Sequence, residues 1–579
     1  MLAKTGAFGF VLHSHLPYVR QAGTWPHGEE MVHEAICDTY VPLLQALCAL
    51  AEEGCDYRVA IEVTPILAEQ LSDPLVIADY RVYMAALIDR VDEAERHYTR
   101  QGDASLASLA RYYAEWNRQI VAAFEHQFQA DLLGVLRRLQ DAGLVELVAG
   151  AGTHPFLPLM SRDSTARAHI GLGVREYVRR FGRQPRCMWL PECGYRPPEY
   201  DMSHGHAVFR PGLETFLDEV GIRGFFADSS AVEGGEVAII PARASSYREE
   251  VARAGLPRTR RLPAHNTAWP YLVGQSNVAV FARDRLTGGQ VWSASEGYPG
   301  HFAYREFHKK DAICGMRFWK ITGNGVALGE KEHYDPIAAF GGVAAQADHF
   351  VRLLEAHVAG NAGLVAEPPP MILSPYDTEL FGHWWFEGVE WLKQVLRRLA
   401  VHPTIELTTP GDYLERYPPE ESIALPQSSW GAGADTRTWF NDATSWMWPI
   451  VHGYELQMED MIRRFPAASG AMEAALNQAA RELLLVESSD WPFLVSTGQA
   501  DAYASLRFRT HAARFDSLVD QLLSERIQEE ELGRAAALDN PFLTLDYHLF
   551  AGQPEPAPPV QSPFSPRTSV PSLPAARSN

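Results

Sequence analysis

The stretch that decides the fold is "CMWLPECGY", residues 187–195. Its first four residues are apolar and predict a short buried strand, which Pro191 ends because proline cannot donate to a sheet. Glu192 follows directly, so a carboxylate stands at the carboxyl end of the predicted strand. An acid in this position is either a structural partner or a reactive group, and the rest of the chain shows which to expect.

Seven more short apolar runs end in polar or turn residues in the same way, at 7–15, 57–65, 144–155, 222–230, 277–285, 370–379 and 404–412. The segments between them carry helical patterns, and residues 111–143 keep apolar positions at three- and four-residue steps. Strands that alternate with helices predict βα units and a mostly parallel sheet. The fold class is therefore α/β, and seven or eight units suggest a closed or nearly closed barrel.

Polar side chains gather where these runs end: His13, His15, His154, Glu192, Asp228, Arg283, Asp284 and Asp377. In a βα barrel all such strand ends open on one face, and that face carries catalysis. The sequence therefore predicts an active site built from residues that are far apart along the chain.

Outside the strands the chain divides into regions of different character. Residues 66–143 predict a helical excursion, and residues 416–551 predict an α-helical C-terminal domain on a catalytic domain of residues 1–415. Residues 552–579 are rich in Pro and Ser without an apolar pattern, so we expect a disordered tail.

Composition excludes several classes of partner. The net charge of −21 leaves no basic surplus for nucleic acid or anionic membranes and suits a neutral substrate. No apolar run reaches ~20 residues, so no membrane span is expected. The N-terminal "MLAKTGAFGFVLHSH" lacks a cleavage site and predicts a strand. Six scattered cysteines without a CxxC pair predict free thiols in the cytoplasm.

Two of the strand-end carboxylates have surroundings suited to catalysis. Glu192 lies beside Trp189 and Tyr195, and Asp377 lies in the aromatic stretch "SPYDTELFGHWWFEG". Apolar walls raise the pKa of a carboxyl group, as a general acid near neutral pH requires. One carboxylate and one such acid are the minimum equipment of a glycosidase. The alternative is that each acid caps a helix or pairs with an arginine.

Three histidines allow more than one reading. His13 and His15 lie on the same side of an extended segment, and His154 ends another strand. With an aspartate they could bind zinc, they could donate hydrogen bonds to sugar hydroxyls, or they could satisfy turns. No HxxEH or HExxH spacing supports a metal.

The order of the motifs resembles glycoside hydrolase family 57. The series is "HSHLPY", "GTHPFLP", "WLPECGY", "VFARD" and "SPYDTELFGHWW", followed by a Trp-rich "SSWG…TWFND" with helices after it, over about residues 7–550. The resemblance implies an incomplete (β/α)7 barrel, a small helical insertion around residues 193–220 and a helical C-terminal domain. It also implies a retaining mechanism without metal or organic cofactor.

Carried over by motif, the resemblance implies that Glu192 is the nucleophile and Asp377 the acid/base. The implied sugar-contacting residues are His13, His15, His154, Arg283, Gly300, Trp292, Trp430, Trp439, Asp442 and Asp490. Trp439 has domain-interface packing as its alternative, and Asp490 could instead cap the helix that follows it.

The implied activity is α-1,4-glucan branching on amylose or glycogen, in glycogen or storage-glucan synthesis, by a monomer or small homo-oligomer. Branching members carry a tyrosine-tipped loop before the "FARD" arginine. Residues 242–284 give no clear match, and Tyr247 and Tyr271 are the tyrosines available there. An α-amylase or a 4-α-glucanotransferase is therefore the alternative within the family. A metal-dependent polysaccharide deacetylase and a non-catalytic glucan-binding protein are the alternatives from other classes.

Overall fold

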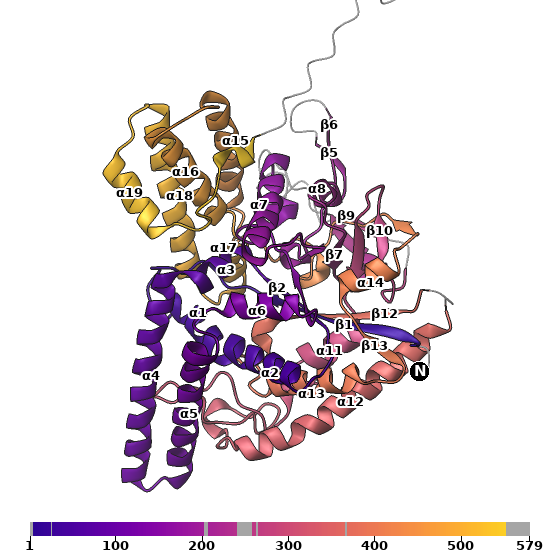
Figure 1. Cartoon of the computed structure of the whole chain (residues 1–579). Helices are drawn as coiled ribbons and strands as arrows, with labels where there is room; N and C mark the ends of the chain where they lie inside the picture. Colours follow the sequence, from indigo (N-terminus) through magenta and orange to yellow (C-terminus); the bar gives the residue numbers. More distant parts are fainter. Residues whose placement is uncertain are drawn as a thin grey trace, which may run out of the picture.

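The computed structural model describes residues 4–24, 26–201, 207–234, 236–239, 258–261, 265–364 and 368–551. The predicted tail at 552–579 and Tyr247 lie outside the described residues. The eight apolar runs of the sequence all contain strands, and together with two further short strands they form two five-stranded sheets at the centre of the molecule (Figure 1).

The first sheet is entirely parallel and is built around β1 (Gly6–Ser14). Its order is β12 (Met371–Asp377), β1, β2 (Val59–Val63) and β3 (Val145–Val148), and β13 (Ile405–Leu407) pairs with the start of β1. His13 of β1 is in register with Asp377 on one side and with Glu62 on the other. Three polar side chains from distant parts of the chain therefore lie side by side.

The second sheet has the order β14 (Ser422–Ile423), β10 (Tyr271–Val273), β11 (Ala279–Ala282), β7 (Gly224–Ala227) and β4 (Cys187–Met188). Only the β10–β11 pair in this sheet is antiparallel. A separate two-stranded pair joins β8 (Glu236–Ile239) and β9 (Arg258–Arg261).

Backbone hydrogen bonds join the two sheets at both edges. Beyond β3 and β4, Trp189 N donates to Ala149 O at 2.7 Å, and Ala149 forms a parallel bridge with Met188. At the other junction, the amide of Asp284, which follows β11, donates to the carbonyl of Leu373 in β12 at 2.9 Å. The predicted mixed α/β fold with parallel sheets is confirmed.

Alternation along the strands sorts apolar side chains into two cores. In β1, Ala7 and Val11 join an inner cluster with Trp189 and Phe281, whereas Phe8 and Phe10 join the large cluster under the helices. Successive strand residues point to opposite faces, so one strand supplies both clusters. Strands buried on both faces are typical of parallel sheets covered by helices.

The predicted excursion at 66–143 is helical, with α3 (Pro65–Ser72), α4 (Pro74–Gln101), α5 (Ala104–Ala122) and α6 (Leu132–Asp141). Helices α4 and α5 form a long hairpin that extends away from the sheets (Figure 1). The Asp73 side chain accepts from the first amides of α4, and Gly102, with φ of 76°, ends that helix in the left-handed conformation.

One stretch next to this hairpin has the composition of a membrane helix. Within the described residues, Glu29–Glu52 is long and apolar enough to span a bilayer, but 72% of its most apolar window is buried in the molecule. It comprises α1 (Glu29–Ala35), a π-helical turn (Ile36–Tyr40) and α2 (Val41–Glu52). This burial is typical of a core helix.

Helices also connect and cover the remaining strands. They are α7 (Asp163–Phe181), α8 (Leu213–Glu219), α9 (Ser229–Glu233), α11 (Arg285–Trp292), α12 (Pro336–Ala362), α13 (Gly388–Ala400) and α14 (Pro410–Arg416). The expectation of a helical insertion at 193–220 is wrong for its first part, where β5 (Glu199–Asp201) pairs with β6 (Val208–Arg210) before α8. Pro197 and Pro198 disfavour a helix there, and Arg210 pairs with Glu199 at 3.1 Å.

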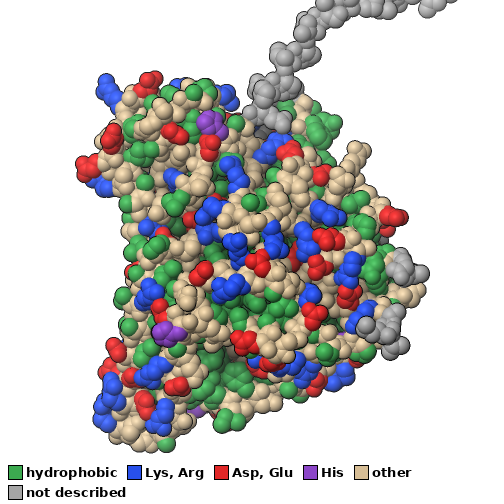
Figure 2. Space-filling view, in the orientation of Figure 1, with side chains coloured by type: hydrophobic (Ala, Val, Ile, Leu, Met, Phe, Trp, Pro, Cys, Tyr) green, Lys and Arg blue, Asp and Glu red, His purple; other side chains and the backbone are tan. Residues whose placement is uncertain are grey.

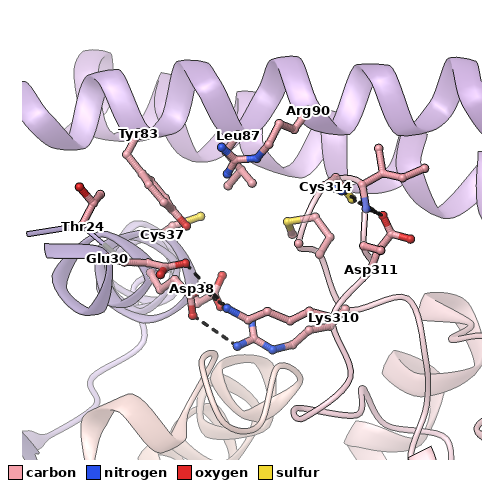
Figure 3. A pocket seen from close by; sticks show the side chains of 16 residues that line it. Thr24, Glu30, Cys37, Asp38, Tyr83, Leu87, Arg90, Lys310, Asp311 and Cys314 are labelled. Carbon is pink, nitrogen blue, oxygen red and sulfur yellow. Dashed lines mark hydrogen bonds and ion pairs between the residues drawn. The ribbon is translucent and has the colours of Figure 1, made fainter. Parts of the chain in front are cut away.

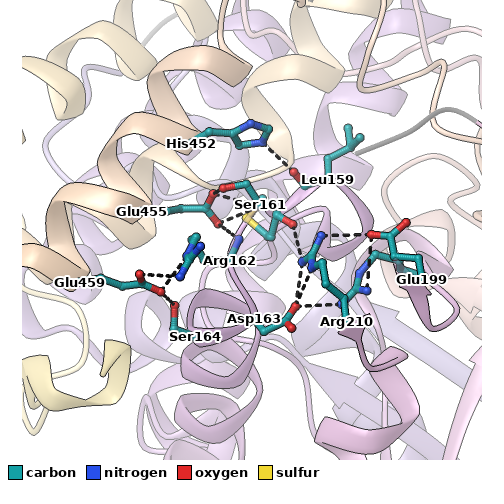
Figure 4. A network of polar contacts seen from close by, with 12 residues as sticks. Leu159, Ser161, Arg162, Asp163, Ser164, Glu199, Arg210, His452, Glu455 and Glu459 are labelled. Atoms are coloured by element: carbon teal, nitrogen blue, oxygen red, sulfur yellow. Dashed lines mark hydrogen bonds and ion pairs between the residues drawn. The ribbon is translucent and has the colours of Figure 1, made fainter. Parts of the chain in front are cut away.

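The C-terminal region consists of α15 (Trp448–Arg464), α16 (Ala471–Val486), α17 (Asp490–Thr497), α18 (Asp501–Leu523) and α19 (Glu529–Leu538). Buried polar contacts attach α15 to the segment before α7 (Figure 4). The Glu455 carboxylate accepts from the amides of Ser161 and Arg162 at 3.0 and 3.3 Å, and His452 Nε2 donates to Leu159 O. These contacts hold the C-terminal helices beside the sheets.

Candidate functional site

Glu192 lies in a strained turn at the end of β4. Its φ is 61° and that of Cys193 is 49°, the left-handed region that non-glycine residues seldom adopt. The turn is held because Cys193 N donates to Leu190 O at 2.9 Å and Trp430 N donates to Glu192 O at 3.0 Å. Backbone strain of this kind is often found at functional sites.

The Glu192 side chain is held by the same tryptophan. Trp430 Nε1 donates to Glu192 Oε2 at 2.7 Å, so one residue fixes both the backbone and the carboxylate. The second carboxylate, Asp377, is the last residue of β12 and lies beside His13 in the register of the sheet. Both carboxyl groups are therefore placed by backbone elements and not by mobile loops.

The two carboxyl groups share one electrostatic environment. Burial raises the pKa of Glu192 to about 7, and the hydrogen bond from Trp430 opposes that rise. Burial raises the pKa of Asp377 well above its usual value, and the negative charges of Glu379 and Glu192 raise it further. A raised pKa suits a general acid near neutral pH, and the charge of Glu192 favours the protonated form of Asp377.

A third buried acid lies two residues beyond Asp377. Burial raises the pKa of Glu379 to about 7, and the Tyr40 hydroxyl donates to its carboxylate. Its charge favours the protonated form of Asp377. The sequence analysis missed this residue, although it belongs to the same "YDTELF" motif.

The three predicted histidines form a stack. The ring of His13 lies 4.6 Å from Trp189, at 12° to its plane, and 5.1 Å from His154, whose ring is 3.8 Å from that of His15. Glu62 Oε2 lies 2.7 Å from His13 Nδ1, which fixes the orientation of the ring. Burial and the neighbouring rings lower the pKa of His13 and of His154 well below the usual value. Both are therefore neutral at pH 7.

The histidines differ in what they can offer a ligand. His15 uses both ring nitrogens, with Nδ1 at 3.1 Å from Thr64 Oγ1 and Nε2 at 3.0 Å from Asp490 Oδ1. His154 Nδ1 lies 2.9 Å from Ser489 Oγ, and its buried Nε2 has no partner among the described residues. His154 therefore keeps a polar atom free, whereas the His15–Asp490 pair is satisfied internally.

Arg283 and the tryptophans line the other side of Glu192. Arg283 pairs with Asp228 at 2.8 Å, and its guanidinium carbon is 5.9 Å from the Trp430 ring centre. The Trp430 ring also lies edge-on to Trp189 at 4.8 Å and to Trp292 at 6.4 Å. The structure thus brings Arg283, Trp292 and Trp430 together around the carboxylate.

Three of the predicted sugar-contacting residues are placed differently. Trp439 is fully buried and stacks on Phe156 at 4.0 Å, so it has no free face for a sugar and packs the interior instead. A Cβ on Gly300 would lie 2.0 Å from Ala294 O, so the close approach of that backbone requires glycine. Asp442 is exposed, in the turn before α15.

Metal-binding potential lies elsewhere. In the described parts of the chain, two groups could hold an ion, Glu34–Asp38–His383 and Glu482–His511–Asp539. Neither contains a residue around Glu192. Cationic side chains already neutralise both, since Lys310 lies 2.6 Å from Glu34 and Arg514 pairs with Asp539. The absence of a metal at the site stays a prediction.

Sequence reasoning also missed Glu62 and Ser489, the partners of His13 and His154. A signal existed for Glu62, because "VAIEV" places one charged residue in an otherwise apolar strand and a buried charge needs a partner. Ser489 carried no signal, because its role follows from where α17 packs.

Comparisons with known proteins agree with this geometry. Residues 9–426 match glycosyl hydrolase family 57, and residues 450–550 match the family described as "1,4-alpha-glucan branching enzyme, C-terminal". The chain is 42% identical to the 1,4-alpha-glucan branching enzyme TK1436 of Thermococcus kodakarensis over 543 residues. This match covers 93% of this chain and 77% of that protein. The crystal structure of TK1436 superposes with a TM-score of 0.85, covering 95% of this chain and 97% of the other.

Two further solved structures are similar. The branching enzyme of Pyrococcus horikoshii has a TM-score of 0.85 at 35% identity, covering 95% of this chain and 98% of its own. The alpha-amylase AmyC of Thermotoga maritima has a TM-score of 0.79 at 29% identity, covering 95% and 99%.

Proposed function

Because the chain belongs to glycosyl hydrolase family 57, we propose that it is a 1,4-α-glucan branching enzyme. It cleaves an α-1,4 linkage of amylose or glycogen and joins the released fragment through an α-1,6 linkage. The observation that carries this function is the pair of buried strand-end carboxyl groups, Glu192 and Asp377, both with raised pKa values. The match of residues 450–550 to the branching-enzyme C-terminal family supports branching in particular.

The reaction we propose proceeds with retention. Asp377 protonates the glycosidic oxygen while Glu192 attacks the anomeric carbon and forms a glucosyl-enzyme. Asp377, now a base, deprotonates the 6-hydroxyl of the acceptor sugar, which displaces Glu192. For this outcome the two carboxyl groups should be about 5–5.5 Å apart when substrate is bound. Neutral His154 and the Arg283–Asp228 pair would donate to and accept from sugar hydroxyls.

The proposed scaffold for this chemistry is an incomplete (β/α)7 barrel. Its seven parallel strands would be β1, β2, β3, β4, β7, β11 and β12. The hydrogen bonds at the two sheet edges support closure, and the inner apolar cluster supports a filled interior. We propose residues 1–415 as this domain and 416–551 as the helical C-terminal domain.

The proposed setting is glycogen or storage-glucan synthesis in the cytoplasm, by a monomer or small homo-oligomer. All six cysteines are free, which is consistent with a reducing compartment. Charged side chains of both signs are interspersed on the face in Figure 2, as expected for a protein whose substrate is neutral.

An α-amylase is the second candidate, because the AmyC structure has the same fold at 29% identity. The two differ only in what resolves the glucosyl-enzyme, water or a sugar hydroxyl. Tyr271 does not supply the tyrosine-tipped loop, since it lies buried within β10.

The test is to incubate the protein with amylose and count new α-1,6 linkages against new reducing ends. A branching enzyme forms many linkages and few reducing ends, and the reverse result would identify a hydrolase. Glu192→Gln and Asp377→Asn should each lower turnover by roughly 10³-fold or more, because each removes a group that bonds or transfers a proton. Circular dichroism should show that both variants stay folded. Near-normal activity in either variant would overturn its assigned role.

A further inference from the structure

A cavity lies between α4 and the loop at residues 310–317. Its volume is about 560 Å³, within the range of small-ligand sites. Figure 3 shows Tyr83, Leu87 and Arg90 pointing into it from α4, with Glu30 and Asp38 on the facing helices. Glu192 and Asp377 do not line it.

The lining carries charged side chains of both signs, four acidic and three basic, and most of them pair with one another. Glu34 Oε1 lies 2.6 Å from Lys310 Nζ, Glu34 Oε2 lies 3.3 Å from Arg317, and Arg317 also lies 3.7 Å from Asp38. An anion would meet the carboxylates, and a cation would meet the basic side chains. A neutral ligand is repelled by neither set of charged side chains, and if it both donates and accepts hydrogen bonds it can bond to both sets.

The remaining walls are apolar. Tyr83, Leu87, Ile313 and Met316 all line the cavity. A sugar presents hydroxyls around its edge and C–H groups on its faces, so it can use the charged side chains and the apolar walls together. The chemistry of the cavity is therefore that of a saccharide site.

A stack of flat groups extends this wall outward. The Arg317 guanidinium lies 4.4 Å from the ring centre of Phe307, and the Trp384 ring lies 4.2 Å from the same ring at 31°. Trp384 is 49% exposed, the most exposed tryptophan in the described parts of the chain. Its exposed face lies next to the apolar wall of the cavity and is available to stack on the flat face of a ligand.

The backbone ties this tryptophan to the catalytic strand. Trp384 N donates to Glu379 O at 3.1 Å, and Glu379 is two residues beyond Asp377. The length of an extended chain from Asp377 to Glu379, added to the length of this hydrogen bond, puts the Trp384 backbone nitrogen within roughly 13 Å of the Cα atom of Asp377. The stack thus lies a few sugar units from the acid/base.

We propose that Trp384 and the adjoining cavity bind the α-1,4-glucan on the leaving-chain side of the cleaved bond, which is the side that the acceptor chain then occupies. This inference rests on the proposed function. Holding the acceptor there raises its local concentration over water at the glucosyl-enzyme. Trp384 is a specificity-determining residue in this scheme and takes no part in proton transfer.

The test compares Trp384→Ala with Trp384→Phe on amylose. Losing the stacking face should weaken acceptor binding about fivefold, from about 1 kcal/mol of aromatic contact. The ratio of α-1,6 linkages to new reducing ends should therefore fall several-fold in Trp384→Ala, because water then resolves more of the glucosyl-enzyme. Trp384→Phe keeps an aromatic face and should restore most of the ratio.

Tyr200→Ala is the matched control, because Tyr200 is 69% exposed on β5, far from α4 in Figure 1. It should leave the ratio unchanged. A ratio in Trp384→Ala equal to wild type would overturn the inference, and so would an equal loss in Tyr200→Ala.

A binding measurement separates this inference from the proposed function. Maltoheptaose is titrated calorimetrically into Glu192→Gln and into Glu192→Gln with Trp384→Ala. Weaker binding in the double variant supports the site even if the wild-type protein forms no branches. Equal binding in the two proteins overturns the site even if the wild-type protein branches amylose.

Discussion

At the scale of single residues, Trp430 holds Glu192, the proposed nucleophile, through two hydrogen bonds. Its amide fixes the strained Glu192 turn, and its indole N–H donates to the carboxylate. A hydrogen bond to the charged form lowers a carboxyl pKa, so Trp430 counteracts part of the cost of burying that carboxylate. A residue proposed to contact the sugar would therefore also tune the pH range of the proposed nucleophile.

Trp430→Phe tests this role through the pH dependence of kcat/KM. Glu192 must be ionised to attack, so activity falls as the pH drops through its pKa of about 7. Without the indole donor the pKa of Glu192 rises further. The acid-side fall of kcat/KM should then move to higher pH by up to about one unit. Rates measured from pH 5 to 9 give the shift.

Trp292→Phe is the control for this measurement. Trp292 lies edge-on to Trp430, but its indole nitrogen has no hydrogen-bond partner among the described residues. In this variant the acid-side fall of kcat/KM should occur at the same pH as in the wild-type protein, even if KM itself changes. A shift of equal size in both variants would mean that the limb does not report the Trp430–Glu192 bond.

The positions of the two carboxyl groups could be predicted from the sequence, whereas the surroundings of other site residues depend on packing. Glu192 and Asp377 stand at strand ends within aromatic stretches, a pattern visible in the sequence. Trp439 could not be distinguished from Trp430, because both lie in one Trp-rich stretch and only tertiary packing buries the first. Asp490 was expected at the sugar, and its bond to His15 depends on how α17 packs against β1.

At the scale of elements, the attachment of α15 before α7 carries a stability prediction. Glu455 accepts from two buried amides and the Ser161 hydroxyl (Figure 4). Glu455→Ala leaves these donors unsatisfied, so the free energy of unfolding should fall by about 3 kcal/mol. Urea unfolding followed by circular dichroism measures this change.

Glu473→Ala provides the comparison, because Glu473 is exposed on α16. It should change the free energy of unfolding by less than about 0.5 kcal/mol. Equal destabilisation by the two substitutions would show that the attachment of α15 does not depend on Glu455.

The elements themselves were largely predictable. All eight apolar runs contain strands, because parallel strands buried on both faces appear as continuous hydrophobic segments. The short strands β5, β6, β8, β9, β10 and β14 were missed. Two to four residues are too few to show a clear period, and their pairing depends on contacts with other strands.

At the scale of the whole molecule, we expect catalysis without a metal. The carboxylates that could bind an ion away from the site are paired with Lys310, Arg317 and Arg514. Dialysis against EDTA should therefore leave both the branching rate and the thermal midpoint unchanged. A tenfold loss of rate that added zinc restores would contradict this and would favour the deacetylase-like alternative.

The site draws on both ends of the sequence. Glu192 and Asp377 come from the strands, whereas Trp430, Ser489 and Asp490 come from the last third of the chain. A polypeptide that stops near residue 425 would contain all the described strands but not Trp430, the residue that restrains Glu192. We therefore expect synthesis itself to delay activation, because a growing or prematurely stopped chain would meet cellular glucan with an unrestrained Glu192.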